Sequence, residues 1–146
     1  MKILGIGNAI VDVICKVKDN FLENNGLKKG GMELIFDENK FKELLSNLKI
    51  EKTVSGGSVA NSIVGLSQLG NKVGFIGKVC DDDFGSKYEE GLKKENVEYF
   101  YSKKKEELPT GTCLVLITPD SERTMCTFLG TAGKINEKDV DINAIK

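Results

Sequence analysis

Apolar residues occur in short runs that alternate with amphipathic stretches. The runs predict buried or half-buried strands at residues 2–7, 13–17, 31–36, 51–55, 73–77, 111–118 and 122–129. Apolar positions three and four residues apart predict helices over residues 38–48, 58–69 and 84–95. Strands that alternate with helices indicate an α/β fold built on a parallel sheet.

Aspartates mark the start of two of these helices. We expect Asp37 to cap the helix over 38–48, because its side chain accepts hydrogen bonds from the free amides of a first turn. The run Asp81–Asp83 precedes the helix over 84–95. Three adjacent carboxylates do not converge on one metal ion, and a helix N-terminus favours negative charge. Capping is therefore preferred to a metal site, and no metal-binding residues are predicted.

Three stretches interrupt the strand–helix alternation: residues 13–17, 31–36 and 111–129. The last is a predicted hairpin that turns at Pro119-Asp120-Ser121. These stretches suggest a small second sheet beside the main one. No linker rich in Pro, Gly or Ser divides residues 1–146.

Composition excludes several classes of protein. The 146 residues are 40% hydrophobic and 29% charged with a net charge of −1, which is typical of a folded domain and provides no basic field for nucleic acid. No apolar run approaches the roughly 20 residues that span a bilayer. The N-terminus does not match a signal peptide, so a cytoplasmic location is expected. The chain has no histidine, and its four cysteines form no C-x-x-C pair, which excludes zinc-finger and Cys-His chemistry as well as a Ser-His-Asp triad.

Two kinds of segment resemble nucleotide-binding motifs but lack residues that those motifs require. Gly5-Ile6-Gly7-Asn8 begins like a dinucleotide fingerprint, but Ile10 replaces its third glycine, and Asp12 comes too early to be the acidic residue that follows about 20 residues later in that fingerprint. Gly77-Lys78 and Gly133-Lys134 lack the upstream glycine and the following Ser or Thr of a P-loop. A nicotinamide-dependent Rossmann domain is therefore disfavoured, and tight dinucleotide binding would be needed to support it.

Several polar residues and glycines remain as candidates for binding a small molecule. Asn8 and Asp12 follow the first strand, where α/β sheets place their ligands. A carboxylate accepts hydrogen bonds from a vicinal diol, and an amide both donates and accepts. Gly56 and Gly57 leave room for a ring beside the backbone, and Asn61 lies on the same side of the next helix. Each residue alone has a structural alternative as a turn residue or a surface amide.

The segments that carry these residues resemble a known family. Gly-Ile-Gly-Asn8-Ala-Ile-Val-Asp12 resembles the strand-end motif of ribokinase-like (PfkB) carbohydrate and nucleoside kinases, and its Asn-x-x-x-Asp form is closest to the adenosine-kinase branch. Gly56-Gly57-Ser58-Val59-Ala60-Asn61 resembles the sugar-binding turn of that family. The resemblance covers almost the whole chain. It implies a parallel α/β domain with a small β lid, whose strands would lie near 13–17, 31–36 and 111–129.

The resemblance also implies a function. Asn8, Asp12, Gly56, Gly57 and Asn61 would bind a sugar or nucleoside, and Arg123 is a candidate phosphate contact. The complete protein would phosphorylate a hydroxymethyl group with ATP and Mg²⁺. No catalytic residue is assigned within this chain.

Family members are about twice as long and carry a Gly-Ala-Gly-Asp motif, whose aspartate is the general base, in a second half. The motif does not occur here. We therefore expect residues 1–146 to be the N-terminal substrate-binding half, inactive alone, with the ATP-binding half absent. The alternative is a truncated homologue that binds a sugar or nucleoside, or pairs with another subunit, without catalysis. A homodimer through the lid sheet remains open.

Overall fold

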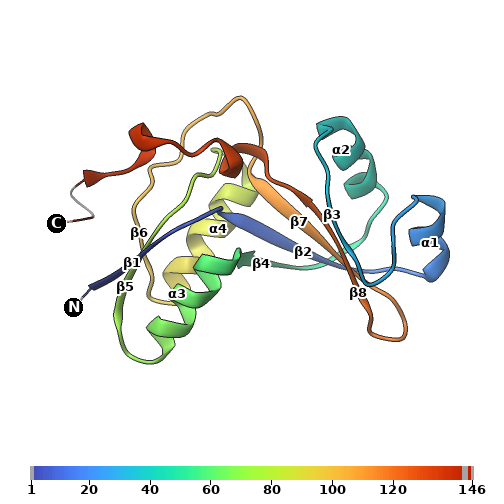
Figure 1. Ribbon diagram of the computed structural model, residues 1–146, viewed down its shortest axis with the longest axis horizontal. Coiled ribbons are helices and arrows are strands. Elements are labelled where there is room, and N and C mark those ends of the chain that lie inside the picture. The colour runs from blue at the N-terminus through green and yellow to red at the C-terminus, as the bar shows by residue number, and fades with distance from the viewer. Residues whose placement is uncertain (1, 143–144, 146) are drawn as a thin grey trace.

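The computed structural model describes residues 2–142 and 145 and contains two β-sheets (Figure 1). The smaller sheet is parallel, with the strand order β1-β5-β6. Its strands are β1 (Lys2–Ile6), β5 (Lys72–Ile76) and β6 (Glu98–Tyr99). The α/β architecture with a parallel sheet is as predicted.

The larger sheet has five strands in the order β3-β8-β7-β2-β4. Its strands are β2 (Ile10–Lys16), β3 (Met32–Leu34), β4 (Ile50–Gly56), β7 (Gly111–Ile117) and β8 (Arg123–Phe128). β7 and β8 form the expected hairpin, whereas β2 pairs parallel to β7 and antiparallel to β4. The three stretches that suggested this sheet account for β2, β3, β7 and β8. β4 is the additional strand, because it pairs with β2 and not with the parallel sheet.

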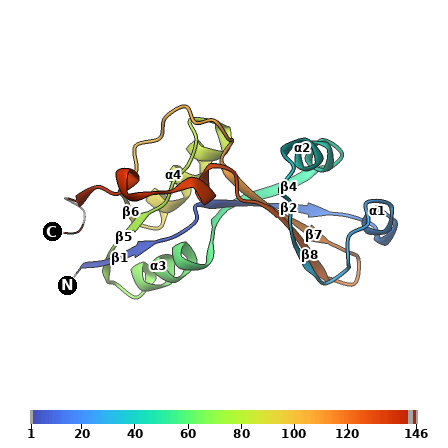
Figure 2. The ribbon, with the colours of Figure 1, turned by 45° about the horizontal axis from the view of Figure 1, so that its top comes forward.

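Four α-helices accompany these sheets in the described part of the chain: α1 (Asp19–Asn24), α2 (Glu38–Ser46), α3 (Ser58–Gln68) and α4 (Asp83–Lys94). The parallel sheet with α3 and α4 lies at one end of the molecule, and the larger sheet extends from it toward α1 and α2 (Figures 1 and 2). Two short 3-10 helices, η1 (Gly130–Lys134) and η2 (Glu137–Asp139), lie in the segment that returns past the parallel sheet. α1 and both 3-10 helices were not predicted.

Side-chain caps begin two helices as expected. The Asp37 carboxylate accepts from the amide of Asn39 at 2.8 Å at the start of α2. Asp82 caps α4 by accepting from the amide of Gly85 at 2.8 Å. The capping role predicted for the aspartate run is therefore confirmed, and Asp82 is the residue that performs it.

One continuous hydrophobic core joins the two sheets. It includes Val11 and Val13 of β2, Phe75 of β5 and Tyr88 of α4, all of which are buried. All four cysteines are buried and unpaired, as expected for thiols that pack as small hydrophobic groups. No helix in the described residues is both long and apolar enough to cross a bilayer.

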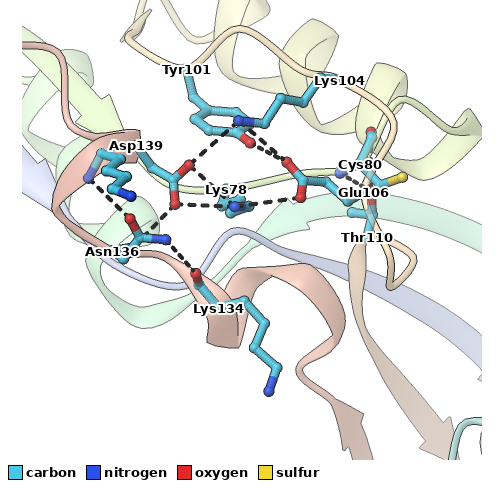
Figure 3. Close-up of polar contacts among 10 residues, drawn as sticks. Lys78, Cys80, Tyr101, Lys104, Glu106, Thr110, Lys134, Asn136 and Asp139 are labelled. Atoms are coloured by element: carbon cyan, nitrogen blue, oxygen red, sulfur yellow. Dashed lines mark hydrogen bonds and ion pairs between the residues drawn. The ribbon is translucent and has the colours of Figure 1, made fainter.

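A buried ion cluster follows β5 (Figure 3). The Lys78 side chain is 8% exposed, and its Nζ lies 3.1 Å from Asp139 Oδ2 and 3.4 Å from Glu106 Oε2. The Tyr101 hydroxyl donates to Glu106 at 2.7 Å. Burial alone would lower the pKa of Lys78, but the hydrogen bond and charge of Asp139, with the charge of Glu106, raise it above its ordinary value. Through Glu106 and Asp139, the cluster connects the 100–106 loop and η2 to the end of β5.

Candidate functional site

An open hollow of about 520 Å³ lies where β1, β2 and α3 meet. It contains four of the residues predicted to bind substrate, namely Asn8, Asp12, Gly57 and Asn61. The other lining residues are Gly7, Ile10, Ser58, Val59, Cys113 and Thr127. The two predicted motifs, which are more than 40 residues apart in the sequence, therefore contribute to one site.

Asp12 is the carboxylate of this hollow. It lies on β2, in register with Val54 of β4 and Cys113 of β7, and it is half-buried. Burial raises the pKa of the Asp12 carboxyl above its ordinary value. Among the described residues, none forms a hydrogen bond or an ion pair with this carboxylate at contact distance. Its oxygens are therefore available to accept hydrogen bonds from a ligand.

Gly56 and Gly57 are required by contacts within the chain itself. A Cβ atom at Gly56 would lie 2.4 Å from Asp12 Oδ2, because Gly56 pairs with Ile10 and Asp12 is the next residue on the same face. A Cβ atom at Gly57 would lie 2.5 Å from the Asn8 carbonyl, and Gly57 has a φ of 99°. The space beside Gly56 that we expected a ring to use is thus taken by the Asp12 carboxylate, while Gly57 borders the hollow.

Helix α3 brings Asn61 into the site. Gly57 is its N-cap residue, and the Asn61 amide donates to the Gly57 carbonyl at 2.9 Å, so Asn61 lies one turn beyond the glycine. Its side chain is exposed at the hollow, as is that of Asn8. The site therefore presents one carboxylate and two amides, a set that suits the hydroxyls of a sugar.

One wall of the hollow is apolar. Ile10 and Cys113 pack with Ala132 of η1 in a small buried cluster, to which Leu129 is adjacent. Neither Cys113 nor Thr127 was predicted as a site residue. The signal that identifies them is strand register, since Cys113 pairs with both Asp12 and Thr127. Asn61 also borders a second hollow of about 470 Å³, between β4, α3 and α4.

Arg123 is not among the residues that line the hollow. It is exposed at the start of β8, in register with Ile117, next to the hairpin turn. Thr127, which does line the hollow, follows four residues later on the same strand, a separation of roughly 13 Å at the rise of a β-strand. The structure does not bring Arg123 to the other predicted residues, so its contact with phosphate stays a prediction.

Within residues 2–142 and 145, no group of three or more His, Cys, Asp or Glu side chains is placed to hold a metal ion. The described residues therefore do not form a Mg²⁺ site by themselves.

Comparison with known proteins identifies what the chain is similar to. A family model described as pfkB family carbohydrate kinase matches residues 6–145. A 5-dehydro-2-deoxygluconokinase from Mesomycoplasma hyopneumoniae (strain 232) is 30% identical over 118 residues, which are 80% of this chain and 35% of that protein.

Solved structures agree with the family match. The adenosine kinase from Sinorhizobium meliloti has a TM-score of 0.86 and 34% identity over 99% of this chain and 44% of its own. A probable sugar kinase from Rhizobium etli CFN 42 has a TM-score of 0.84 and 33% identity, over 96% of this chain and 42% of its own. The chain thus spans about a third of the length of the curated relative and less than half of the length of either structure.

Proposed function

The chain belongs to the pfkB family of carbohydrate kinases, and from that membership we propose that it forms the substrate-binding part of a sugar or nucleoside kinase. The observation that supports this most is the Asp12 carboxylate, which lines the same open hollow as Asn61 and has no ion-pair or hydrogen-bond partner in the described chain. We propose that the complete protein transfers phosphate to a hydroxymethyl group of its substrate. The relatives named as sugar kinases and as an adenosine kinase support both substrate classes.

We assign a role in substrate binding to each polar group of the hollow. Asp12 accepts hydrogen bonds from two neighbouring hydroxyls of the sugar, and its partial burial strengthens them because water competes less there. Asn61 and Asn8 donate to and accept from further hydroxyls. Ile10 and Cys113 contact the apolar side of the ring. Together these contacts orient the hydroxymethyl group, and correct orientation alone lowers the barrier of a transfer reaction.

Phosphoryl transfer also requires a base and a site for ATP with Mg²⁺. The described residues do not fit such a metal site, and the sequence has no Gly-Ala-Gly-Asp motif. We propose that the general-base aspartate and most of the ATP site belong to another segment of the complete protein, and that residues 1–146 alone are inactive. The phosphate contact proposed for Arg123 would then form at the hairpin end of β8, outside the hollow.

Substitution of Asp12 tests this function. In the complete protein, Asp12→Ala is expected to abolish phosphate transfer to every sugar or nucleoside that the wild type accepts, with the thermal unfolding temperature preserved. Asp83→Ala provides a matched control, because Asp83 is an exposed carboxylate in the first turn of α4, outside the hollow. Near-wild-type turnover by Asp12→Ala would refute the assignment.

A second candidate is a non-catalytic homologue that binds a sugar or nucleoside, or pairs with another subunit. The observation that favours pairing is a group of exposed apolar side chains on and beside β3 and β8, including Met32 (63% exposed), Phe36 (85%) and Met125 (38%). We propose a homodimer through this face of the larger sheet as the form to test. Sedimentation should then show a concentration-dependent dimer that Phe36→Lys disrupts, and a strict monomer would exclude this pairing.

A further inference from the structure

Helix α4 is hydrogen-bonded to the end of β4, directly before the glycine turn that borders the hollow. Tyr88 is fully buried beneath β4, and its hydroxyl donates a hydrogen bond to the Gly56 carbonyl at 3.3 Å. The Ser55 hydroxyl in turn donates to the Tyr88 carbonyl at 3.0 Å. α4 therefore holds the last two residues of β4, directly before the turn at Gly57.

The close approach of α4 to β4 is built into the sequence. A Cβ atom at Gly91, inside α4, would lie 1.9 Å from Ser55 Oγ and 3.0 Å from Ser55 Cβ, so a larger residue here would require the Ser55 side chain to move. Glycine is unfavourable in a helix interior, yet here it lets the helix backbone pack directly against the strand. The contact between Tyr88 and Gly56 thus belongs to a tight helix–strand junction.

Gly56 lies between Tyr88 and Asp12. The Asp12 carboxylate packs against the Gly56 Cα from the side of the hollow, and the Tyr88 hydroxyl binds the Gly56 carbonyl. Burial, and after it the negative charge of Asp12, raises the pKa of Tyr88. The hydroxyl therefore remains protonated, and able to donate, throughout the neutral range.

We propose that Tyr88 is a positioning residue for the substrate-binding turn. Its hydroxyl fixes the Gly56 carbonyl, and through Gly56 it holds the Gly57 N-cap of α3 and the Asp12 carboxylate in the arrangement that forms the hollow. Tyr88 does not touch the hollow itself. The consequence for catalysis rests on the function proposed above, whereas the ordering of the turn does not.

Tyr88→Phe isolates the hydroxyl. The ring packs against Phe75 and Tyr99, with centroids 6.2 and 5.9 Å away, and phenylalanine keeps these contacts. Tyr99→Phe is a matched control, because the Tyr99 hydroxyl also donates to the carbonyl of a glycine at the carboxyl end of a strand, Gly77. Both variants lose one hydrogen bond of the same kind, but only Tyr88 bonds to the turn.

Amide hydrogen exchange of the 146-residue chain tests the ordering directly. The Asn61 amide donates to the Gly57 carbonyl at the start of α3, and the Phe41 amide donates in the same way to Asp37 at the start of α2. Tyr88→Phe should speed exchange at Asn61 about tenfold relative to Phe41, as expected for loss of one buried hydrogen bond. Tyr99→Phe should leave that ratio unchanged. Equal acceleration at both amides, or none at Asn61, would overturn the proposal.

Kinetics of the complete protein test the link to substrate. Tyr88→Phe should raise KM for the sugar or nucleoside about tenfold and leave kcat within about twofold, because a loosened turn weakens binding of ground state and transition state alike. A fall in kcat at unchanged KM would contradict a positioning role. If exchange at Asn61 changes as expected but the wild-type protein phosphorylates none of a panel of sugars and nucleosides that includes adenosine, ribose and fructose, the proposed function fails while the ordering of the turn by Tyr88 stands.

Discussion

Two groups of polar residues follow the carboxyl ends of the neighbouring parallel strands β1 and β5. The Gly7 amide donates to the Ile76 carbonyl at 3.1 Å, so the end of β1 lies next to the end of β5. Beyond β5, Lys78 is buried and paired with Asp139 and Glu106 (Figure 3). In the chain beyond β1, the Asp12 carboxylate and the side-chain amides of Asn8 and Asn61 line an open hollow, without a hydrogen-bond or ion-pair partner among the described residues.

The difference between the two groups lies in where the partners are. The charged groups of the ion cluster are paired with one another within the chain. These pairs connect segments that are distant in sequence, and they therefore contribute to the stability of the fold. The carboxylate and amide side chains of the hollow have no hydrogen-bond partner among the described residues, which is unfavourable for a half-buried carboxylate and agrees with the ligand-binding role proposed above. The carboxyl end of the parallel sheet thus leads into a group that is paired within the chain and a group that we propose binds a ligand, and the following substitutions should separate the two roles.

The largest effect is expected from Lys78→Met. This change leaves Asp139 and Glu106 buried without their cation, and breaking one side of a buried ion pair destabilises a protein by about 3–5 kcal/mol. Urea unfolding of the 146-residue chain measures it. Lys104→Met is the control, because Lys104 is 60% exposed and lies 3.8 Å or more from the same carboxylates, so we expect a loss below about 1 kcal/mol. Equal losses in the two variants would show that the cluster does not stabilise the fold.

Gly57→Ala should come next. Alanine at a φ of 99° is strained, by about 1–3 kcal/mol, and its Cβ would also meet the Asn8 carbonyl. We expect a loss of stability of that size together with loss of ligand binding. Gly70→Ala is a suitable control, since Gly70 also has a positive φ but a Cβ there meets nothing within 4 Å. A Gly57→Ala protein that binds sugar as tightly as Gly70→Ala would contradict the role of the turn.

Asp12→Asn should weaken ligand binding about 10- to 100-fold with little loss of stability, as expected when charge-assisted hydrogen bonds become neutral ones. It should also change the dependence on pH. Because burial raises the pKa of Asp12 in the folded protein, the wild type loses stability relative to Asp12→Asn as the pH rises from about 3.8 through that raised value. Ligand affinity should follow the opposite course and fall as the pH drops through the same range.

Chemical denaturation and calorimetric titration across this pH range check both trends of Asp12. A stability difference between wild type and Asp12→Asn that stays constant with pH would show that the carboxyl pKa is not raised. If Asp12→Asn lost as much stability as Lys78→Met, Asp12 would contribute to folding, as Lys78 does, and not mainly to ligand binding.

The smallest effect is expected from Arg123→Gln. Arg123 is exposed, lies outside the hollow and has no ion pair with any residue of the described chain. Its substitution should change stability by less than about 0.5 kcal/mol and leave the affinity for unphosphorylated sugar unchanged. Urea unfolding and calorimetry on the same sample measure both. A clear loss of sugar affinity would mean that the hairpin contributes to the hollow directly.

Local patterns predicted the parts of the fold that depend on neighbours in sequence. Asp37 and the apolar spacing after it defined α2, and the β7–β8 hairpin followed from its turn residues. α1 was missed because it buries only Leu22 and begins without a side-chain cap. The pairing of β4 with β2 was missed as well, since strand register over such a distance leaves no local signal.

The site could be predicted only in part, for the same reason. Asn8, Asp12, Gly57 and Asn61 occur in short motifs and do meet in one hollow. Cys113 and Thr127 join them through strand pairing alone, which the sequence does not specify locally. Lys78 was seen only as part of an incomplete P-loop, because its partner Asp139 is 61 residues away. The sequence also did not show why residue 56 is a glycine, because that requirement depends on the position of the Asp12 side chain.

The most direct test of the comparison is a nuclear magnetic resonance titration of the isotopically labelled 146-residue chain with adenosine, ribose and fructose in turn. We expect at least one of them to shift the amide signals of Asn8, Gly57 and Asn61 and to leave those of Lys78 and Glu106 in place. The same ligand should cause no such shifts in Asp12→Asn at equal concentration. Shifts centred on the ion cluster, or shifts at the hollow that persist unchanged in Asp12→Asn, would contradict it.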